Sequence, residues 1–104
     1  ELAYGPRKLI DILRALMAKP RVLLLDEPSS GLDRQERARI DRLLVEINRR
    51  LGVSMLVVEH HMDLVRSISD HVIALQSGRL LMQGTAAEVL DSQGFREAMV
   101  GVAA

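Results

Sequence analysis

Two adjacent carboxylates follow a short apolar run in the first third of the chain. Residues 22–25 read Val-Leu-Leu-Leu, Asp26 and Glu27 come next, and Pro28 follows them. The run is typical of a buried strand, which must end here because proline cannot donate to a central ladder. Ligands of open parallel sheets bind at the carboxyl ends of strands, and adjacent strand residues point to opposite faces. We therefore expect one carboxylate to serve a magnesium ion and the other to face a water molecule; the alternative is a turn with two solvated acids.

The hydrophobic periodicity predicts the elements that position these acids. Strands and helices alternate, which favours an α/β fold with a mostly parallel sheet, flanking helices and a C-terminal β-hairpin. The expected helices cover residues 5–18, 34–51, 64–68, 86–90 and 95–100, and the expected strands cover residues 22–26, 53–59, 71–76 and 80–83.

Two capping boxes and a glycine mark helix ends. Asp33 with Glu36, and Thr85 with Glu88, have the spacing of a residue that caps a helix and an acid that reaches back to it. Gly52 is placed to end the longest helix.

Composition narrows the class of partner. The 104 residues are 48% hydrophobic, enough for one small core, and 14 basic residues balance 14 acidic ones. This balance gives no general attraction to nucleic acid or acidic lipid, and with Tyr4 and Phe95 as the only aromatic residues a base-stacking platform is not expected. The chain has no cysteine, so it can form neither a disulfide nor a thiolate metal site. Its apolar runs are too short to cross a bilayer, and it shows no signal peptide.

Four motifs in order resemble the C-terminal half of an ABC-type ATPase, a P-loop NTPase. They are Leu2-Ala3-Tyr4-Gly5, the 22–28 run, Ser30-Gly31-Leu32-Asp33, and His60. The resemblance implies ATP and Mg²⁺ as ligands. It also implies that residues 1–104 form a C-terminal fragment of one ABC ATPase domain, with signature motif, Walker B, D-loop and H-loop. The Walker A loop and the glutamine loop are absent, and the chain starts at Glu1, so we expect an N-terminal part to be missing.

The resemblance assigns catalytic roles to residues at the two predicted strand ends. Phosphoryl transfer needs charge neutralisation and an oriented nucleophile more than covalent chemistry. By this likeness Asp26 supports Mg²⁺, Glu27 polarises the attacking water, and His60 contacts the γ-phosphate. His61 is the alternative to His60; we favour His60, with His61 as a surface histidine, and we interpret His71 as structural.

The signature-like segment departs from the family pattern. Leu2, Ala3, Tyr4 and Gly5 would face the ATP of a partner subunit from a helix N-terminus, where free N–H groups favour phosphate. Ala3 stands where the family has serine, Tyr4 where it has glycine, and Pro6 where it has glutamine, so we expect fewer hydrogen bonds to phosphate. The alternative is an ordinary helix started by proline.

The resemblance also implies an assembly. The D-loop, Ser30 to Asp33, would cross a dimer interface, although Asp33 also has a local role as a helix cap. The fragment would contribute to two sites and complete neither, so alone it should not hydrolyse ATP. Expected partners are a second ABC ATPase subunit, identical or different, and transmembrane permease subunits, with no nucleic acid. The protein would be peripheral, on the cytoplasmic face of the cell membrane.

Finer details resemble the ATP-binding subunits of branched-chain amino-acid importers. These details are Leu-Ala-Tyr-Gly at 2–5 and the segments at 58–65, 68–72 and 84–89, although proline is commoner than Ala86. One alternative is a non-transport ABC ATPase acting on DNA or ribosomes, but the basic or coiled-coil insertions of such proteins are not visible. Another is a nucleotide-binding regulatory subunit with weak hydrolysis, which Ala3 and Pro6 favour and the Asp26-Glu27 pair and His60 oppose.

Overall fold

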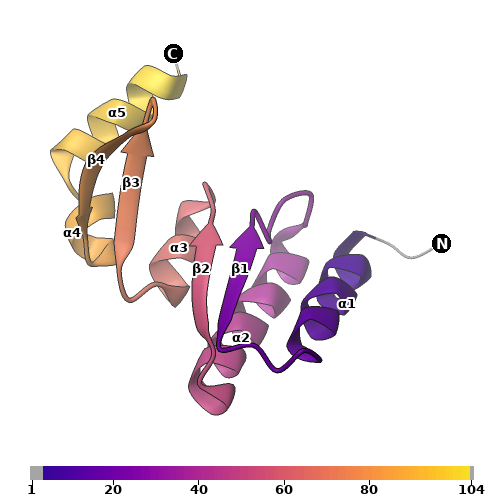
Figure 1. The fold of residues 1–104 in the computed structure, drawn as a ribbon. Coiled ribbons are helices and arrows are strands. Elements are labelled where there is room, and N and C mark those ends of the chain that lie inside the picture. The colour runs from indigo at the N-terminus through magenta and orange to yellow at the C-terminus, as the bar shows by residue number, and fades with distance from the viewer. Residues whose placement is uncertain (1–3, 104) are drawn as a thin grey trace. The chain divides into compact units, whose positions relative to one another are not determined.

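The computed structural model describes residues 4–103, and these divide after Leu64 into two compact units. The α/β class expected from the periodicity is confirmed (Figure 1). The described strands form two small sheets, one parallel and one antiparallel. None of the helices within residues 4–103 has both the length and the apolar character needed to cross a membrane.

The first unit is built on a parallel strand–helix–strand crossover. Helix α1 (Tyr4–Leu16) precedes strand β1 (Val22–Asp26), and helix α2 (Arg34–Leu51) connects β1 to strand β2 (Ser54–Val58). The two strands pair in parallel from Val22 opposite Ser54 to Asp26 opposite Val58. Their carboxyl ends therefore lie side by side, as the sequence predicts for Asp26 and Glu27 and for the histidine that follows the second strand.

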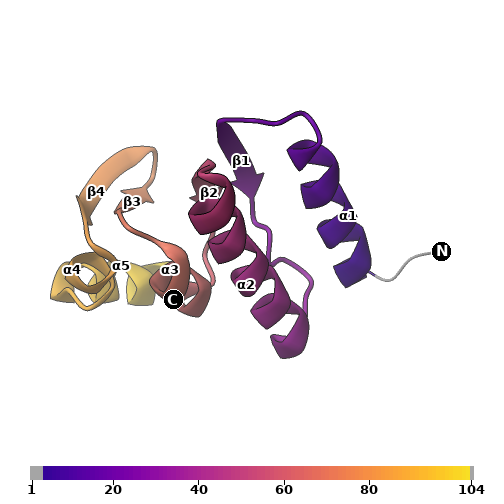
Figure 2. The ribbon, with the colours of Figure 1, turned by 90° about the horizontal axis from the view of Figure 1, so that it is seen from below.

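Helix α2 covers one face of the parallel pair (Figures 1 and 2). Its stripe of Ile40, Leu44 and Ile47 is buried, as is Leu23 on β1. Leu43, beside this stripe in the sequence, is only half-buried. On the opposite face the apolar side chains of Val22, Leu24, Leu56 and Val58 are 58–70% exposed. The alternation shows that burial against α2 sets which face of each strand points inward.

The ends of α2 confirm both sequence signals. Asp33 accepts a hydrogen bond from the Glu36 N–H at 2.8 Å, and Glu36 accepts one from the Asp33 N–H at 3.1 Å. Gly52 ends the helix with φ 66°, a left-handed conformation that glycine adopts without a steric cost.

The second unit is a β-hairpin packed on short helices. Strands β3 (Val72–Gln76) and β4 (Arg79–Gly84) pair antiparallel around a two-residue turn at Ser77 and Gly78, both with positive φ. Helices α4 (Ala86–Leu90) and α5 (Gln93–Ala103) follow. The predicted Thr85–Glu88 capping box is present in both directions. Helix α3 (Met62–Ile68) spans the division between the units and begins two residues before the predicted start at 64.

Loss of the α2 cap should cost measurable stability. Asp33→Ala leaves the Glu36 N–H without its acceptor, so we expect the free energy of unfolding to fall by about 1 kcal/mol in urea denaturation. Glu46→Ala breaks only an exposed ion pair with Arg50 and should change it by less than about 0.5 kcal/mol. Equal effects of the two substitutions would show that the cap does not stabilise α2.

Candidate functional site

The site begins with an unusual backbone conformation at Glu27. Strand β1 ends at Asp26, and Glu27 has φ 48°, in the left-handed region that a residue with a side chain seldom adopts. The expectation that strand alternation directs Glu27 is therefore wrong, because Glu27 lies outside the strand. Its direction is set by a turn that only the three-dimensional structure shows.

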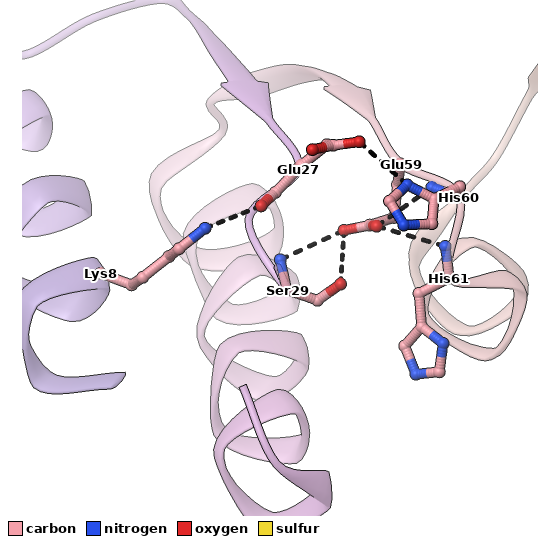
Figure 3. Close-up of polar contacts among 6 residues, drawn as sticks. All are labelled: Lys8, Glu27, Ser29, Glu59, His60 and His61. Atoms are coloured by element: carbon pink, nitrogen blue, oxygen red, sulfur yellow. Dashed lines mark hydrogen bonds and ion pairs between the residues drawn. The ribbon is translucent and has the colours of Figure 1, made fainter. Parts of the chain in front are cut away.

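Hydrogen bonds hold both backbone groups of Glu27. Its N–H donates to the Val58 carbonyl oxygen at 2.7 Å, which extends the link between the strands by one residue. Its carbonyl oxygen accepts from the Ser30 N–H at 3.0 Å and from Lys8 Nζ at 2.8 Å. Lys8 reaches this carbonyl from α1, a contact that the sequence does not predict (Figure 3). These bonds offset the cost of the left-handed conformation, which is about 1–3 kcal/mol.

The side chains of Glu27 and His60 meet at the carboxyl ends of the two strands. Glu27 Oε1 lies 2.9 Å from His60 Nδ1, and the two side chains are 46% and 73% exposed. An ionised carboxylate can only accept, so Nδ1 must carry the proton in this contact and Nε2 remains for another partner. The His61 ring points away from Glu27 (Figure 3). The structure thus pairs Glu27 with His60 and not with His61.

Glu59 joins the loops that carry Glu27 and His60. Its Oε2 accepts from the Ser29 hydroxyl at 2.7 Å and from the Ser29 N–H at 3.2 Å. Its Oε1 accepts from the N–H groups of His60 at 3.0 Å and His61 at 3.2 Å. The sequence alone does not predict this role of Glu59; the available signal is an acid between a strand and two histidines.

The environment of Glu59 favours its ionised form. Burial raises the pKa of Glu59, but the hydrogen bonds from the Ser29 side chain and backbone and from the His61 and His60 N–H groups outweigh burial. The net result is a pKa below the ordinary value for glutamate.

Asp26 places a single carboxylate at the end of β1. It is exposed at the carboxyl end of β1, in register with Val58. Within residues 4–103 there is no group of three or more metal-binding side chains. Proteins usually hold Mg²⁺ through one or two carboxylates together with water and substrate phosphates, so a single exposed aspartate fits this ion.

The start of α1 packs against the cap of α2. Leu2 and Ala3 of the signature-like segment lie outside the described residues, and Tyr4 is the first residue of α1. Gly5 is buried, and a Cβ atom there would collide with the Glu36 carboxylate. The missing side chain of Gly5 therefore permits close approach to the chain's own capping box.

The D-loop-like segment forms a tight turn between β1 and α2. Gly31 has φ 76°, and Leu32 is buried with its carbonyl oxygen accepting from Arg37 Nη1 at 2.8 Å. The Leu32 N–H donates to the Ser29 carbonyl oxygen at 3.3 Å. Ser30 to Asp33 thus follow directly on the Glu27 turn, and Asp33 performs its predicted local role as a cap.

Comparison with known proteins identifies this arrangement. No protein-family model matches the chain. The branched-chain amino-acid transport ATP-binding protein BraF of Pseudomonas aeruginosa is 37% identical over 102 residues, which are 98% of this chain and 40% of BraF. The methionine import ATP-binding protein MetN of Pasteurella multocida is 42% identical over 91 residues, which are 88% of this chain and 26% of MetN. The chain thus spans less than half the length of these relatives.

Solved structures give the same result. MJ1267, an ATP-binding cassette of an ABC transporter in its ADP conformation, superposes with a TM-score of 0.86 at 30% identity, covering 97% of this chain and 41% of MJ1267. CbiO1 of Clostridium perfringens, part of the ABC transporter complex cbiONQ, gives 0.80 at 34% identity, covering 97% of this chain and 40% of cbiO1. The fold is therefore that of the C-terminal part of an ABC ATPase cassette. The homologues of this chain are ABC transporter ATP-binding proteins, including those for branched-chain amino acids.

The lowered pKa of Glu59 should be visible in a titration. Its ionised form is favoured in the fold, so it contributes stability above the ordinary glutamate pKa of 4.5 and loses it as pH falls through the lower folded value. We expect a carboxyl ¹³C NMR titration to place its midpoint below 4.5. Glu59→Gln should remove this contribution to acid unfolding. A midpoint at or above the ordinary value would contradict the described hydrogen bonds.

Proposed function

We propose that this chain is the C-terminal part of an ATP-hydrolysing ABC cassette that energises a transporter. Residues 1–104 supply the signature, Walker B, D-loop and H-loop segments, and the phosphate-binding Walker A loop comes from the remainder of the cassette. The observation that carries the proposal is the 2.9 Å contact between Glu27 and His60 at the carboxyl ends of two parallel strands. This is the edge at which α/β sheets bind ligands.

Glu27 acts on the attacking water in this proposal. Its carboxylate accepts a hydrogen bond from the water and orients or deprotonates it for attack on the γ-phosphate. The Nδ1–H of His60 holds the carboxylate in place, and the opposite ring nitrogen, Nε2, is available to donate to a γ-phosphate oxygen. His60 carries a proton on both nitrogens when it makes the two contacts at once.

Asp26 completes the set of acids at this edge. When bound, Mg²⁺ neutralises charge on the β- and γ-phosphates, and Asp26 would hold the ion directly or through water. Asp26 is exposed and is the last residue of β1, so it lies at the same strand end from which Glu27 reaches His60.

The proposed assembly follows from the division of the site between subunits. The signature-like residues Leu2, Ala3, Tyr4 and Gly5 face the ATP of a second ABC ATPase subunit, and the D-loop lies between the two sites. Transmembrane permease subunits complete the transporter, with the cassette peripheral on the cytoplasmic side. The solved relative cbiO1, part of an ABC transporter complex, supports this kind of assembly.

An amino acid is the proposed solute class, with branched-chain amino acids favoured. The match to BraF spans 98% of this chain and the match to MetN spans 88%, so the former is the fuller likeness. The ATPase acting on DNA or ribosomes and the weakly hydrolysing regulatory subunit are the competing proposals. Measuring ATP turnover after substitution of Glu27 distinguishes the weakly hydrolysing regulatory subunit from a hydrolysing transporter subunit.

Removal of the Glu27 carboxylate tests hydrolysis. In the complete cassette we expect Glu27→Gln to lower ATP turnover by about 100-fold or more, because the amide cannot accept a proton from water. Binding of a fluorescent ATP analogue should persist. His71→Ala, which removes an exposed histidine bonded to Gln83, is a control that should leave turnover unchanged. If the unsubstituted cassette turns over ATP no faster than the Glu27→Gln variant, the result would favour a subunit that only binds nucleotide.

The isolated chain should be inactive. It carries the water-directing residues without the phosphate-binding loop, so residues 1–104 alone should show no ATP turnover above background in the presence of Mg²⁺. A phosphate-release assay on the purified chain measures this. Turnover by the isolated chain that disappears with Glu27→Gln would refute the proposed division of the site.

A further inference from the structure

We propose that Glu59 is a positioning residue that keeps His60 in hydrogen-bonding register with Glu27. This role rests on the proposed function. Glu59 follows β2 directly, and its carboxylate lies between the turn after β1 and the main chain of His60 and His61 (Figure 3). The side chain therefore joins the two segments that carry the water-directing acid and its histidine.

Each carboxylate oxygen of Glu59 accepts hydrogen bonds from one of the two loops. Oε2 accepts from the hydroxyl and the N–H of Ser29 at 2.7 and 3.2 Å. Oε1 accepts from the N–H groups of His60 and His61 at 3.0 and 3.2 Å. Hydrogen bonds to an ionised acceptor are stronger than neutral ones, so the link resists separation of the loops.

The link lies where main-chain pairing of the strands gives way to loops. The strands pair as far as Asp26 opposite Val58, and the Glu27 N–H then donates to the Val58 carbonyl oxygen. One residue further on, the Glu59 carboxylate continues the connection through Ser29. The Glu27–His60 contact is made by exposed side chains, which a shift of either loop would separate.

The donor set explains why the residue is a carboxylate. Three N–H groups and one hydroxyl converge on Glu59, and an ionised carboxylate offers enough lone pairs for all four. Glutamine has one oxygen, and its NH₂ group would oppose at least one main-chain N–H that cannot accept. Ser29 is 5% exposed, so losing its acceptor would leave a buried polar group unsatisfied.

The experiment is a double-mutant cycle in the complete cassette. We expect Glu59→Gln to lower kcat for ATP hydrolysis by about 10- to 100-fold through misplacement of His60, with KM for ATP nearly unchanged. In a His60→Ala background, Glu59→Gln should cause little further loss, because the residue acts through His60. Ser29→Ala, which removes only the hydroxyl, is a milder variant expected to show a smaller loss with the same dependence on His60.

A matched control is available in the other unit. Glu88 also accepts a main-chain N–H, that of Thr85, and has a lowered pKa for this reason, so Glu88→Gln tests carboxylate-to-amide replacement away from the site. It should leave kcat unchanged. Unchanged kcat in Glu59→Gln, or a loss that adds in full to that of His60→Ala, would overturn the role of Glu59.

The outcomes also separate this role from the proposed function. Turnover lost with Glu27→Gln but kept with Glu59→Gln would overturn the positioning role alone. Turnover unaffected by Glu27→Gln would overturn the proposed function, and the positioning role with it.

Discussion

The parallel pairing of β1 with β2 is the constraint on which the site depends. Because the strands run in the same direction and in register, the residues that leave their carboxyl ends emerge together. Glu27 and His60 are 33 residues apart in the chain, and their contact exists because α2 returns the chain to the start of a neighbouring strand. The buried residues Ile40, Leu44 and Ile47 hold α2 on the sheet. Their packing therefore helps to bring Glu27 and His60 together at the carboxyl ends of the strands.

Local signals predicted much of this arrangement. The strand at 22–26 has its predicted bounds because apolar residues end at two acids and a proline, and both capping boxes form because their partners are three residues apart. The placement of Asp26, Glu27 and His60 at one edge followed from parallel strands alone. The family resemblance added the choice of His60 over His61, and the ring directions agree with it.

The remaining features depend on contacts distant in sequence. The left-handed backbone of Glu27 is held by Lys8 and by the carbonyl oxygen of Val58, and no local pattern announces either partner. Nothing in the sequence distinguishes Glu59 from other acids, because its hydrogen bond with Ser29 forms only in the folded chain. Gly5 lies so near Glu36 that a Cβ atom there would collide with the Glu36 carboxylate, which the sequence did not predict. Each of these required the fold before it could be seen.

The backbone at residue 27 implies a conflict between robustness and chemistry. Glycine adopts φ 48° without the penalty that a side chain incurs there. Backbone stability alone would therefore favour glycine at position 27. That replacement would discard the carboxylate. A glutamate in this conformation is the pattern expected at a functional site, where the side chain matters more than the backbone preference.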